Sequence, residues 1–75
     1  MDFELIYFGP KQEAELLENF FEWQGINLKA QIKPETLRHT GGHPAVVLLK
    51  DGGKIKAIGF FAIVNWWKEN GLCRC

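Results

Sequence analysis

The residues best suited to chemistry are the two cysteines of the segment Cys73-Arg74-Cys75. Two thiols one residue apart, beside a cation that stabilises a thiolate, can form and break a disulfide. A disulfide between them closes a small, strained ring, so we expect it to be easily reduced and to take part in exchange rather than to support the fold. The alternative is that both are incidental thiols in a reducing cytosol.

A metal site is the second chemistry that the sequence permits. Two histidines and two cysteines, here His39, His43, Cys73 and Cys75, are a suitable ligand set for zinc. Cys-x-Cys is a less common chelate than Cys-x-x-Cys, however, and Pro44 constrains His43. We therefore expect no bound metal and no cofactor. The sequence shows no catalytic triad, phosphate loop or paired catalytic carboxylate, and its glycine pairs are better explained by turns.

Composition and charge limit the classes of protein to which the chain can belong. The 75 residues make one small domain, and 47% of them are hydrophobic, so a core without disulfides or metals is feasible. The formal net charge is zero, which argues against an electrostatic grip on nucleic acid or anionic lipid. No apolar stretch is long enough to span a membrane, and the first residues do not resemble a signal peptide. We expect a cytoplasmic protein with neither nucleic-acid nor membrane partners.

The predicted strands are arranged around one apolar run, residues 45–49. A run this short and apolar, closed by a glycine-rich turn, is typical of a strand in mid-sheet that is buried on both faces. Apolar or alternating patterns predict further strands at residues 3–8, 26–33 and 54–58. The first two strands and the helix between them should form a βαβ unit with parallel strands.

Three helices are predicted between and after these strands. Apolar residues at i, i+3 and i+4 predict a helix over residues 11–24. Its expected apolar stripe consists of Leu16, Leu17, Phe20, Phe21 and Trp23. Proline and glycine signals predict further helices over residues 34–40 and 60–70. The branched side chains of residues 60–64 leave strand continuation as the alternative there.

Four local motifs, in this order, resemble those of the thioredoxin superfamily, and the length is closest to that of glutaredoxins. The motifs are Tyr7-Phe8-Gly9-Pro10, Thr40-Gly41-Gly42-His43-Pro44, Lys50-Asp51-Gly52-Gly53-Lys54 and Ile58-Gly59-Phe60. The resemblance implies an α/β thioredoxin fold, with a four-stranded mixed sheet in the order 2-1-3-4 and helices on both faces. It implies a glutaredoxin-like domain over residues 1–71, a Cys-Arg-Cys tail over residues 72–75, and a cis peptide bond before Pro44.

The resemblance also locates the family's active site, which is degenerate in this chain. The family needs a Cys-x-x-Cys pair at the start of its first helix, where the helix N-terminus lowers the pKa of the first thiol. Gln12 and Glu15 occupy the two cysteine positions here, and neither side chain can replace a sulfur nucleophile. Because the attacking cysteine is missing, glutathione is not an expected ligand.

The resemblance retains a groove that holds a substrate backbone beside the cis-proline. Carried onto this sequence, the groove is lined by Gly9, Gln12, His43, Pro44, Gly59 and Phe60. A histidine that titrates near pH ~6.5 beside a groove would make binding depend on pH. The alternative is that His43 is a half-exposed loop residue without a role. Trp66 is adjacent to Trp67, so one helix face cannot bury both, and Trp66 is expected to be partly exposed.

Two functional hypotheses follow. In the first, the chain is a degenerate glutaredoxin-like protein, linked to redox biology, that binds a protein or peptide at this groove as a monomer or weak dimer. In the second, it is a thiol–disulfide oxidoreductase or disulfide shuttle that acts through Cys73 and Cys75. Replacing both cysteines with serine should leave the first activity intact and abolish the second. The sequence favours the binding module for the domain itself.

Overall fold

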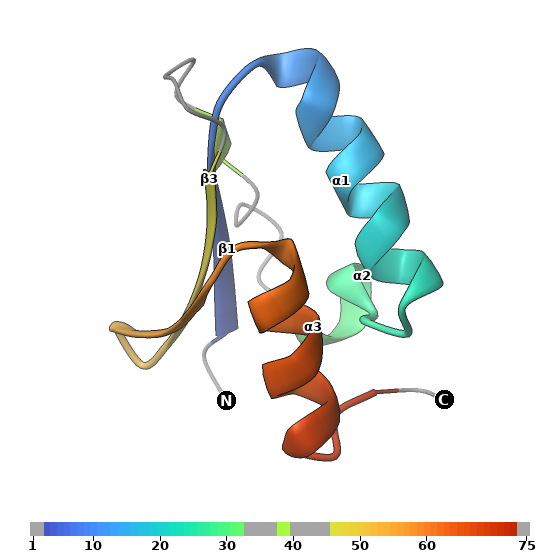
Figure 1. Cartoon of the computed structure of the whole chain (residues 1–75), viewed down its shortest axis with the longest axis vertical. Coiled ribbons are helices and arrows are strands. Elements are labelled where there is room, and N and C mark those ends of the chain that lie inside the picture. Colours follow the sequence, from blue (N-terminus) through green and yellow to red (C-terminus); the bar gives the residue numbers. More distant parts are fainter. Residues whose placement is uncertain (1–2, 33–37, 40–45, 74–75) are drawn as a thin grey trace.

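The structure is a computed structural model, which describes residues 3–32, 38–39 and 46–73. Figure 1 shows the strands as one layer with the helices packed beside it. The elements follow in the order β1 (Phe3–Phe8), α1 (Lys11–Trp23), α2 (Leu28–Gln31), β2 (Arg38–His39), β3 (Val46–Asp51), β4 (Lys54–Ile58) and α3 (Phe60–Glu69).

Three antiparallel strands form the body of the sheet. β1 pairs with β3 along the full length of both strands, and β4 pairs with the other side of β3. The hairpin between β3 and β4 turns through Gly52 and Gly53, whose φ angles of 60° and 83° suit glycine because it has no Cβ. The two-residue strand β2 pairs in parallel with β1, so the hydrogen-bonded order is β2-β1-β3-β4.

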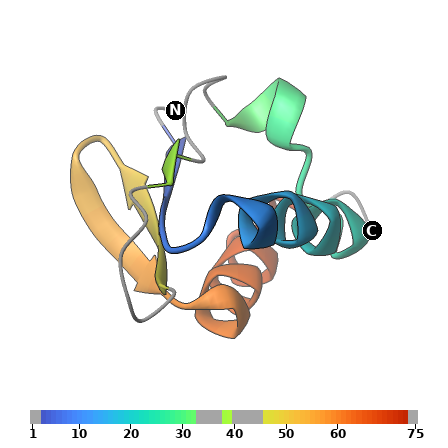
Figure 2. The ribbon, with the colours of Figure 1, turned by 90° about the horizontal axis from the view of Figure 1, so that it is seen from above.

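The described helices all lie on one face of this sheet, as the view from above shows (Figure 2). Alternate strand residues face the helices and are buried, namely Phe3, Leu5 and Tyr7 in β1 and Val47 and Leu49 in β3. Their sequence neighbours point to the opposite face and are only partly buried or exposed. β3 is therefore central but covered on one face, and the prediction of burial on both faces is wrong.

The expected fold class is wrong as well. The resemblance implied an α/β thioredoxin fold with four full strands in a mixed sheet and helices on both faces. The structure is an α+β arrangement, in which three antiparallel strands carry the two long helices α1 and α3 on one face. The parallel pairing that the expected βαβ unit requires is limited to the two residues of β2.

The difference arises first at residues 26–33, which were predicted to form a strand. Four of these residues form the short helix α2, and the amide of Ile32 donates to the carbonyl of Leu28 with helical spacing. The side-chain carbonyl of Gln31 accepts a hydrogen bond from the amide of Asn27, which satisfies a donor at the start of the helix. Asparagine favours such a position, so a local capping preference outweighs the alternating pattern.

The predicted helix over residues 34–40 is the second error. Arg38 and His39 form β2, and they pair with Ile6 and Tyr7 of β1. The other residues of that range lie outside the described part of the chain. Proline can begin a helix, but it is equally common in extended segments, so this signal did not distinguish the two.

The remaining elements agree with the predictions. β1 and β4 have their predicted bounds, and α1 and α3 each end one residue before the predicted end. The helical interpretation of residues 60–64 is confirmed, because α3 begins at Phe60, directly after Gly59.

The core is closed by Trp67 of α3, which is fully buried. Its ring packs on Phe3 of β1 with 4.9 Å between the ring centroids. Its indole N–H donates to the carbonyl of Leu72 at 2.9 Å, and the side-chain amide of Gln31 donates to the same oxygen at 3.1 Å. One carbonyl therefore joins α2, α3 and the segment that follows α3.

We expect Trp67→Phe to lower the free energy of unfolding by about 1–3 kcal/mol, because it leaves a void and removes a hydrogen bond from the Leu72 carbonyl. Trp23→Phe is the matched control, since Trp23 is 87% exposed and its replacement should change stability by less than about 0.5 kcal/mol. Urea unfolding followed by circular dichroism measures both variants. Equal effects would contradict the role of Trp67 in the core.

Candidate functional site

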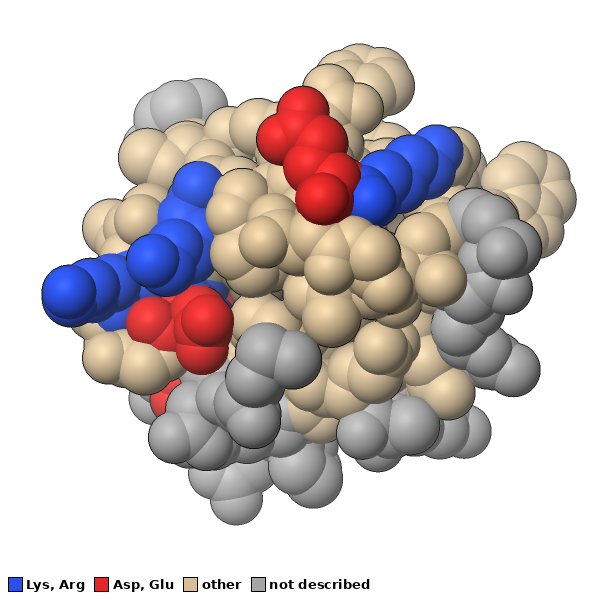
Figure 3. Space-filling view, turned by 90° about the horizontal axis from the view of Figure 1, so that it is seen from below, with Lys and Arg blue, Asp and Glu red and all other residues tan. Residues whose placement is uncertain are grey.

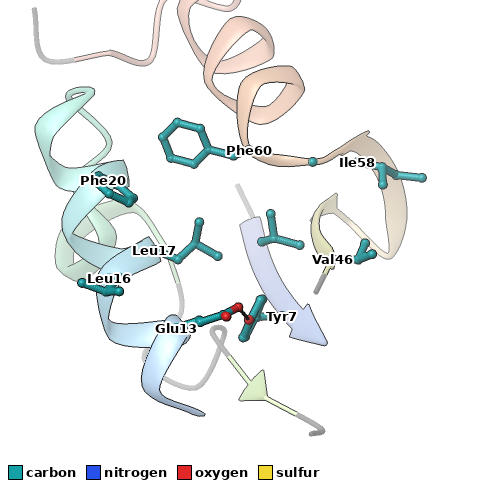
Figure 4. A pocket seen from close by; sticks show the side chains of 10 residues that line it. Tyr7, Glu13, Leu16, Leu17, Phe20, Val46, Ile58 and Phe60 are labelled. Carbon is teal, nitrogen blue, oxygen red and sulfur yellow. Dashed lines mark hydrogen bonds between the residues drawn. The ribbon is translucent and has the colours of Figure 1, made fainter. Parts of the chain in front are cut away.

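An apolar cavity of about 510 Å³ opens between α1 and the start of α3. Figure 4 shows α1 on one side of it, the β4–α3 junction on the other, and β1 between them. A volume in the range of about 300–1,000 Å³ is typical of sites that bind small molecules or side chains of a partner. The lining residues are Tyr7, Glu13, Leu16, Leu17, Phe20, Val46, Val47, Ile58, Gly59 and Phe60.

The α1 wall is apolar because this helix carries two apolar stripes. Ala14 and Phe21 form the buried one, which packs toward the sheet. Leu16 and Phe20, four residues apart, belong to the second stripe and are 57% and 48% exposed. Trp23 continues this stripe and is more exposed still. The sequence predicted a single apolar stripe, whereas the structure divides it in two, and Leu16 and Phe20 form a wall of the cavity.

The opposite wall depends on a sharp turn from β4 into α3. Gly59 makes this turn with a φ of 96°, a conformation that strains other residues, and its amide donates to the carbonyl of Val47 at 2.8 Å. The turn aims Phe60 at α1, where its ring centroid lies 4.9 Å from that of Phe21 and 6.0 Å from that of Phe20. A cluster of aromatic rings thus closes this end of the cavity.

The other end of the cavity is polar. The hydroxyl of Tyr7 donates to Oε2 of Glu13 at 2.9 Å, which joins β1 to the first turn of α1 (Figure 4). Burial of the ring raises the pKa of Tyr7 above 10.0, and the hydrogen bond to Glu13 and the negative charge of that carboxylate raise it further. Tyr7 is therefore held in its neutral, donating form.

Gly9 fixes the position of this tyrosine. A Cβ atom at Gly9 would overlap the hydroxyl oxygen and the Cζ atom of Tyr7. The backbone of Gly9 thus approaches the tyrosine ring more closely than any residue with a side chain could. Gly9 was predicted to line a binding groove, and the structure places it instead where it supports a lining residue from outside the cavity.

The structure brings together only part of the predicted groove. Gly59 and Phe60 line the cavity, whereas Gln12 is exposed in the first turn of α1 and does not. Glu15, the other residue at a family cysteine position, is also exposed and is not among the lining residues. The predicted groove residues His43 and Pro44 lie outside the described residues, as does the expected cis bond.

Eight of the ten described lining residues lie outside the groove that the sequence predicted. The sequence prediction placed Leu16 and Phe20 in the same stripe as Phe21. Successive residues of a helix are about 100° apart around its axis, so Leu16 and Phe20 lie on a face next to that of Phe21. Tyr7 and Glu13 carried no sequence signal as a pair, because their contact depends on how α1 packs on β1. A separate count of the two helix faces would have identified the exposed stripe.

Cys73 lies at the opposite end of α1 from the Tyr7–Glu13 pair. It is half-buried and disulfide-bonded, and its Sγ atom is 3.2 Å from the carbonyl oxygen of Gln24, which follows α1. Arg74 and Cys75 lie outside the described residues. The described residues contain no group of three histidine, cysteine or acidic side chains that could hold a metal ion, and two of the four conceivable zinc ligands lie outside them.

Charge is distributed unevenly over the described surface. α1 carries four exposed glutamates, Glu13, Glu15, Glu18 and Glu22, against one lysine. Lys54 and Lys56 of β4 are exposed at the opposite side of the molecule, and basic side chains gather at one edge of the view from below (Figure 3). Most of the face in this view bears neither acidic nor basic groups. Of these four glutamates, only Glu13 lines the cavity.

A second apolar surface lies on the sheet face that the described helices leave uncovered. Phe8 and Ile55 are 36% and 52% exposed there. The two residues come from β1 and β4, which flank β3, and they lie beside opposite ends of β3. This surface is a competing candidate for contacts with other molecules, and experiments on the cavity must distinguish between the two.

Among the described residues that line the cavity, none carries a thiol, an imidazole or an aliphatic hydroxyl, and the hydroxyl of Tyr7 donates to Glu13. Comparison with protein-family models, curated proteins and solved structures found no match to this chain. Within the described ranges, none of the helices has the length and apolar character that crossing a bilayer requires.

Because Tyr7 is the only tyrosine of the chain, the absorbance of tyrosinate reports on this site alone. We expect an ionisation midpoint above 10.0 in the native protein and a lower one in Glu13→Gln, which removes the charge but not the burial. Glu15→Gln is the matched control. Folding raises the pKa of Tyr7, so the protonated hydroxyl contributes to the free energy of unfolding. This contribution is complete below the pKa that Tyr7 has in the unfolded chain, and it is lost as the pH rises through the pKa that Tyr7 has in the native protein. Equal midpoints in both variants would contradict the Tyr7–Glu13 interaction.

Proposed function

We propose that this chain is a binding module that holds an apolar segment of a protein or peptide in the cavity between α1 and α3. The observation that carries this proposal is the exposed apolar stripe of α1, in which Leu16 and Phe20 face a cavity instead of the core. Exposed apolar residues that line a concave surface mark sites of ligand or protein contact more often than scattered ones do.

The extent of the apolar surface favours a chain segment over a small molecule. Trp23 continues the stripe beyond the cavity at one side, and Phe61 is 79% exposed next to Phe60 at the other. An occupant that covers these residues as well must be longer than the cavity itself. Aromatic side chains such as these are frequent among the residues that dominate the energy of protein interfaces.

The proposal is tested by selecting ligands from a displayed library of random peptides and measuring the dissociation constant of the best binder. We expect Phe20→Gln to weaken that binding about ten-fold, because Phe20 presents half of its surface to the cavity. Glu18→Gln, on the acidic face of the same helix, should leave the constant unchanged. Circular dichroism checks that both variants fold.

Amide chemical-shift changes locate the selected peptide on the protein. Shifts centred on α1 and the start of α3 would support the proposal. Shifts centred on Phe8 and Ile55 would place the binding surface on the uncovered sheet face and overturn it. Selection that yields no binder, or one that is indifferent to Phe20→Gln, would overturn it as well.

A second candidate function is thiol–disulfide exchange through Cys73, and the observation that favours it is the disulfide at this residue. Sγ of Cys73 carries no proton in a disulfide, so its 3.2 Å contact with the Gln24 carbonyl becomes an S–H···O hydrogen bond only on reduction. This contact stabilises the reduced state. A carbonyl favours the thiol over the thiolate, however, so it does not make Cys73 a strong nucleophile. The sequence predicts a cytoplasmic location, and this location is part of the second proposal. Glutathione in the cytoplasm reduces exposed disulfides, so a disulfide at Cys73 would take part in exchange there.

Equilibration in glutathione buffers, followed by alkylation and mass measurement, tests this second candidate. We expect an intramolecular disulfide with a midpoint potential of roughly −200 to −270 mV, the range of glutaredoxins and thioredoxins. Cys75→Ser is the control, since it leaves one thiol and should remove the transition. Thiols that stay reduced throughout, or that pair only between molecules, would exclude a redox role.

A further inference from the structure

The distribution of charge around the cavity indicates what kind of segment it binds. Among its ten lining residues, Glu13 is the one charged side chain, and it lies at the end opposite to Phe60 (Figure 4). An occupant that fills the cavity therefore meets apolar carbon along most of its length and a single carboxylate at one end.

The hydrogen bond from Tyr7 orients this carboxylate and leaves acceptor positions on it for other donors. Tyr7 donates one proton to Oε2 of Glu13. An ionised carboxylate has two oxygens with about four acceptor positions, so it can accept further donors from a ligand. Glu13 is exposed, and the tyrosine hydroxyl limits the directions in which its side chain can turn. The acceptor is thus accessible and held in place.

The surrounding field has the same sign. The helix that bears Glu13 carries three more exposed glutamates and one lysine, so its net charge is negative, although Glu13 is the one of these glutamates that lines the cavity. A negative field beside an apolar cavity attracts cationic ligands and repels anionic ones. Because all of these charges are exposed, the attraction should weaken as salt is added.

We propose that the segment bound by this cavity carries apolar side chains followed by one basic side chain, whose cation pairs with Glu13. This inference rests on the proposed function and specifies its ligand. The apolar side chains contact Leu16, Phe20 and Phe60, and the basic group lies against the carboxylate that Tyr7 orients. A guanidinium is the better match, because its paired donors fit a carboxylate.

Three acetylated tripeptide amides, titrated into the full chain and followed by amide chemical shifts, test this proposal. They share leucine and phenylalanine and end in arginine, in citrulline, which is its neutral isostere, or in glutamate. We expect the arginine peptide to bind about five-fold more tightly than the citrulline peptide, as is usual for a partly exposed ion pair. The glutamate peptide should bind most weakly, and added salt should reduce the preference for arginine.

Glu13→Gln and Glu15→Gln each remove one negative charge from α1, but only the first removes the proposed partner. We expect Glu13→Gln to equalise the affinities for the arginine and citrulline peptides, and Glu15→Gln to preserve the difference. Tyr7 supplies an independent measurement, because arginine stays protonated at the pH where tyrosine ionises. The arginine peptide should lower the Tyr7 midpoint in the native protein, and the citrulline peptide should not.

The outcomes separate this inference from the proposed function. If arginine and citrulline peptides bind the cavity equally, or if both glutamine variants lose the preference alike, the inference is wrong while the binding module stands. If none of the three peptides shifts the resonances of the cavity, both are overturned. A preference for arginine with shifts centred on the uncovered sheet face would also overturn both.

Discussion

The structure depends on the burial of one sheet face under two helices. Three antiparallel strands present alternate apolar residues to one side, and α1 and α3 cover them. A chain of 75 residues buries only about 60% of the surface that its unfolded state exposes, so its stability depends on how completely this one face is buried. Trp67 concentrates much of this burial in one side chain, and its bond to Leu72 ties the segment after α3 to the same core.

The cavity is a consequence of how these two helices share the sheet. Each helix packs one stripe on the strands, and α1 has apolar residues in excess of those that the sheet can bury. Gly59 starts α3 close to β3, and Phe60 bridges to α1 at one end. Between Phe60 and the Tyr7–Glu13 pair at the other end, the α1 wall consists of apolar side chains, of which Leu16 and Phe20 stay exposed to solvent. Apolar surface of this kind is costly in water and persists where contact with another molecule compensates for it.

The elements that could be predicted from the sequence are those whose signals are local and strong. β1, β4, α1 and α3 have repeating apolar patterns with glycine at their ends, and the structure places them within one residue of the predicted bounds. The stretch between α1 and β3 was misassigned, because alternation over eight residues competes with the capping preference of Asn27, and the chain forms the short helix α2 there with local hydrogen bonds. Because residues 26–33 were predicted to form the second strand, the fold class was predicted to contain a βαβ unit that the structure does not have over these residues.

The candidate site was less predictable than the fold, for a related reason. Apolar residues that recur with the helical period predict a buried helix face. The position of a cavity depends in addition on which of two adjacent apolar stripes packs against the sheet. Gly59 and Phe60 were found because Ile58-Gly59-Phe60 resembles the family motif that opens the last helix beside the groove. Leu16 and Phe20 were assigned to the wrong stripe. The pairing of Tyr7 with Glu13 is a contact between elements, and no local pattern encodes it.

Tyr7 links the stability of this protein to its candidate function. Its ring belongs to the core, with 3% of its surface exposed, while its hydroxyl reaches the cavity and orients Glu13. Gly9 leaves room for this ring, since a Cβ atom there would overlap the tyrosine hydroxyl. The polar end of the cavity is therefore positioned by residues of the fold, and not by a flexible loop. A carboxylate placed in this way loses little conformational freedom on binding, which is the condition under which an exposed charge contributes most to specificity.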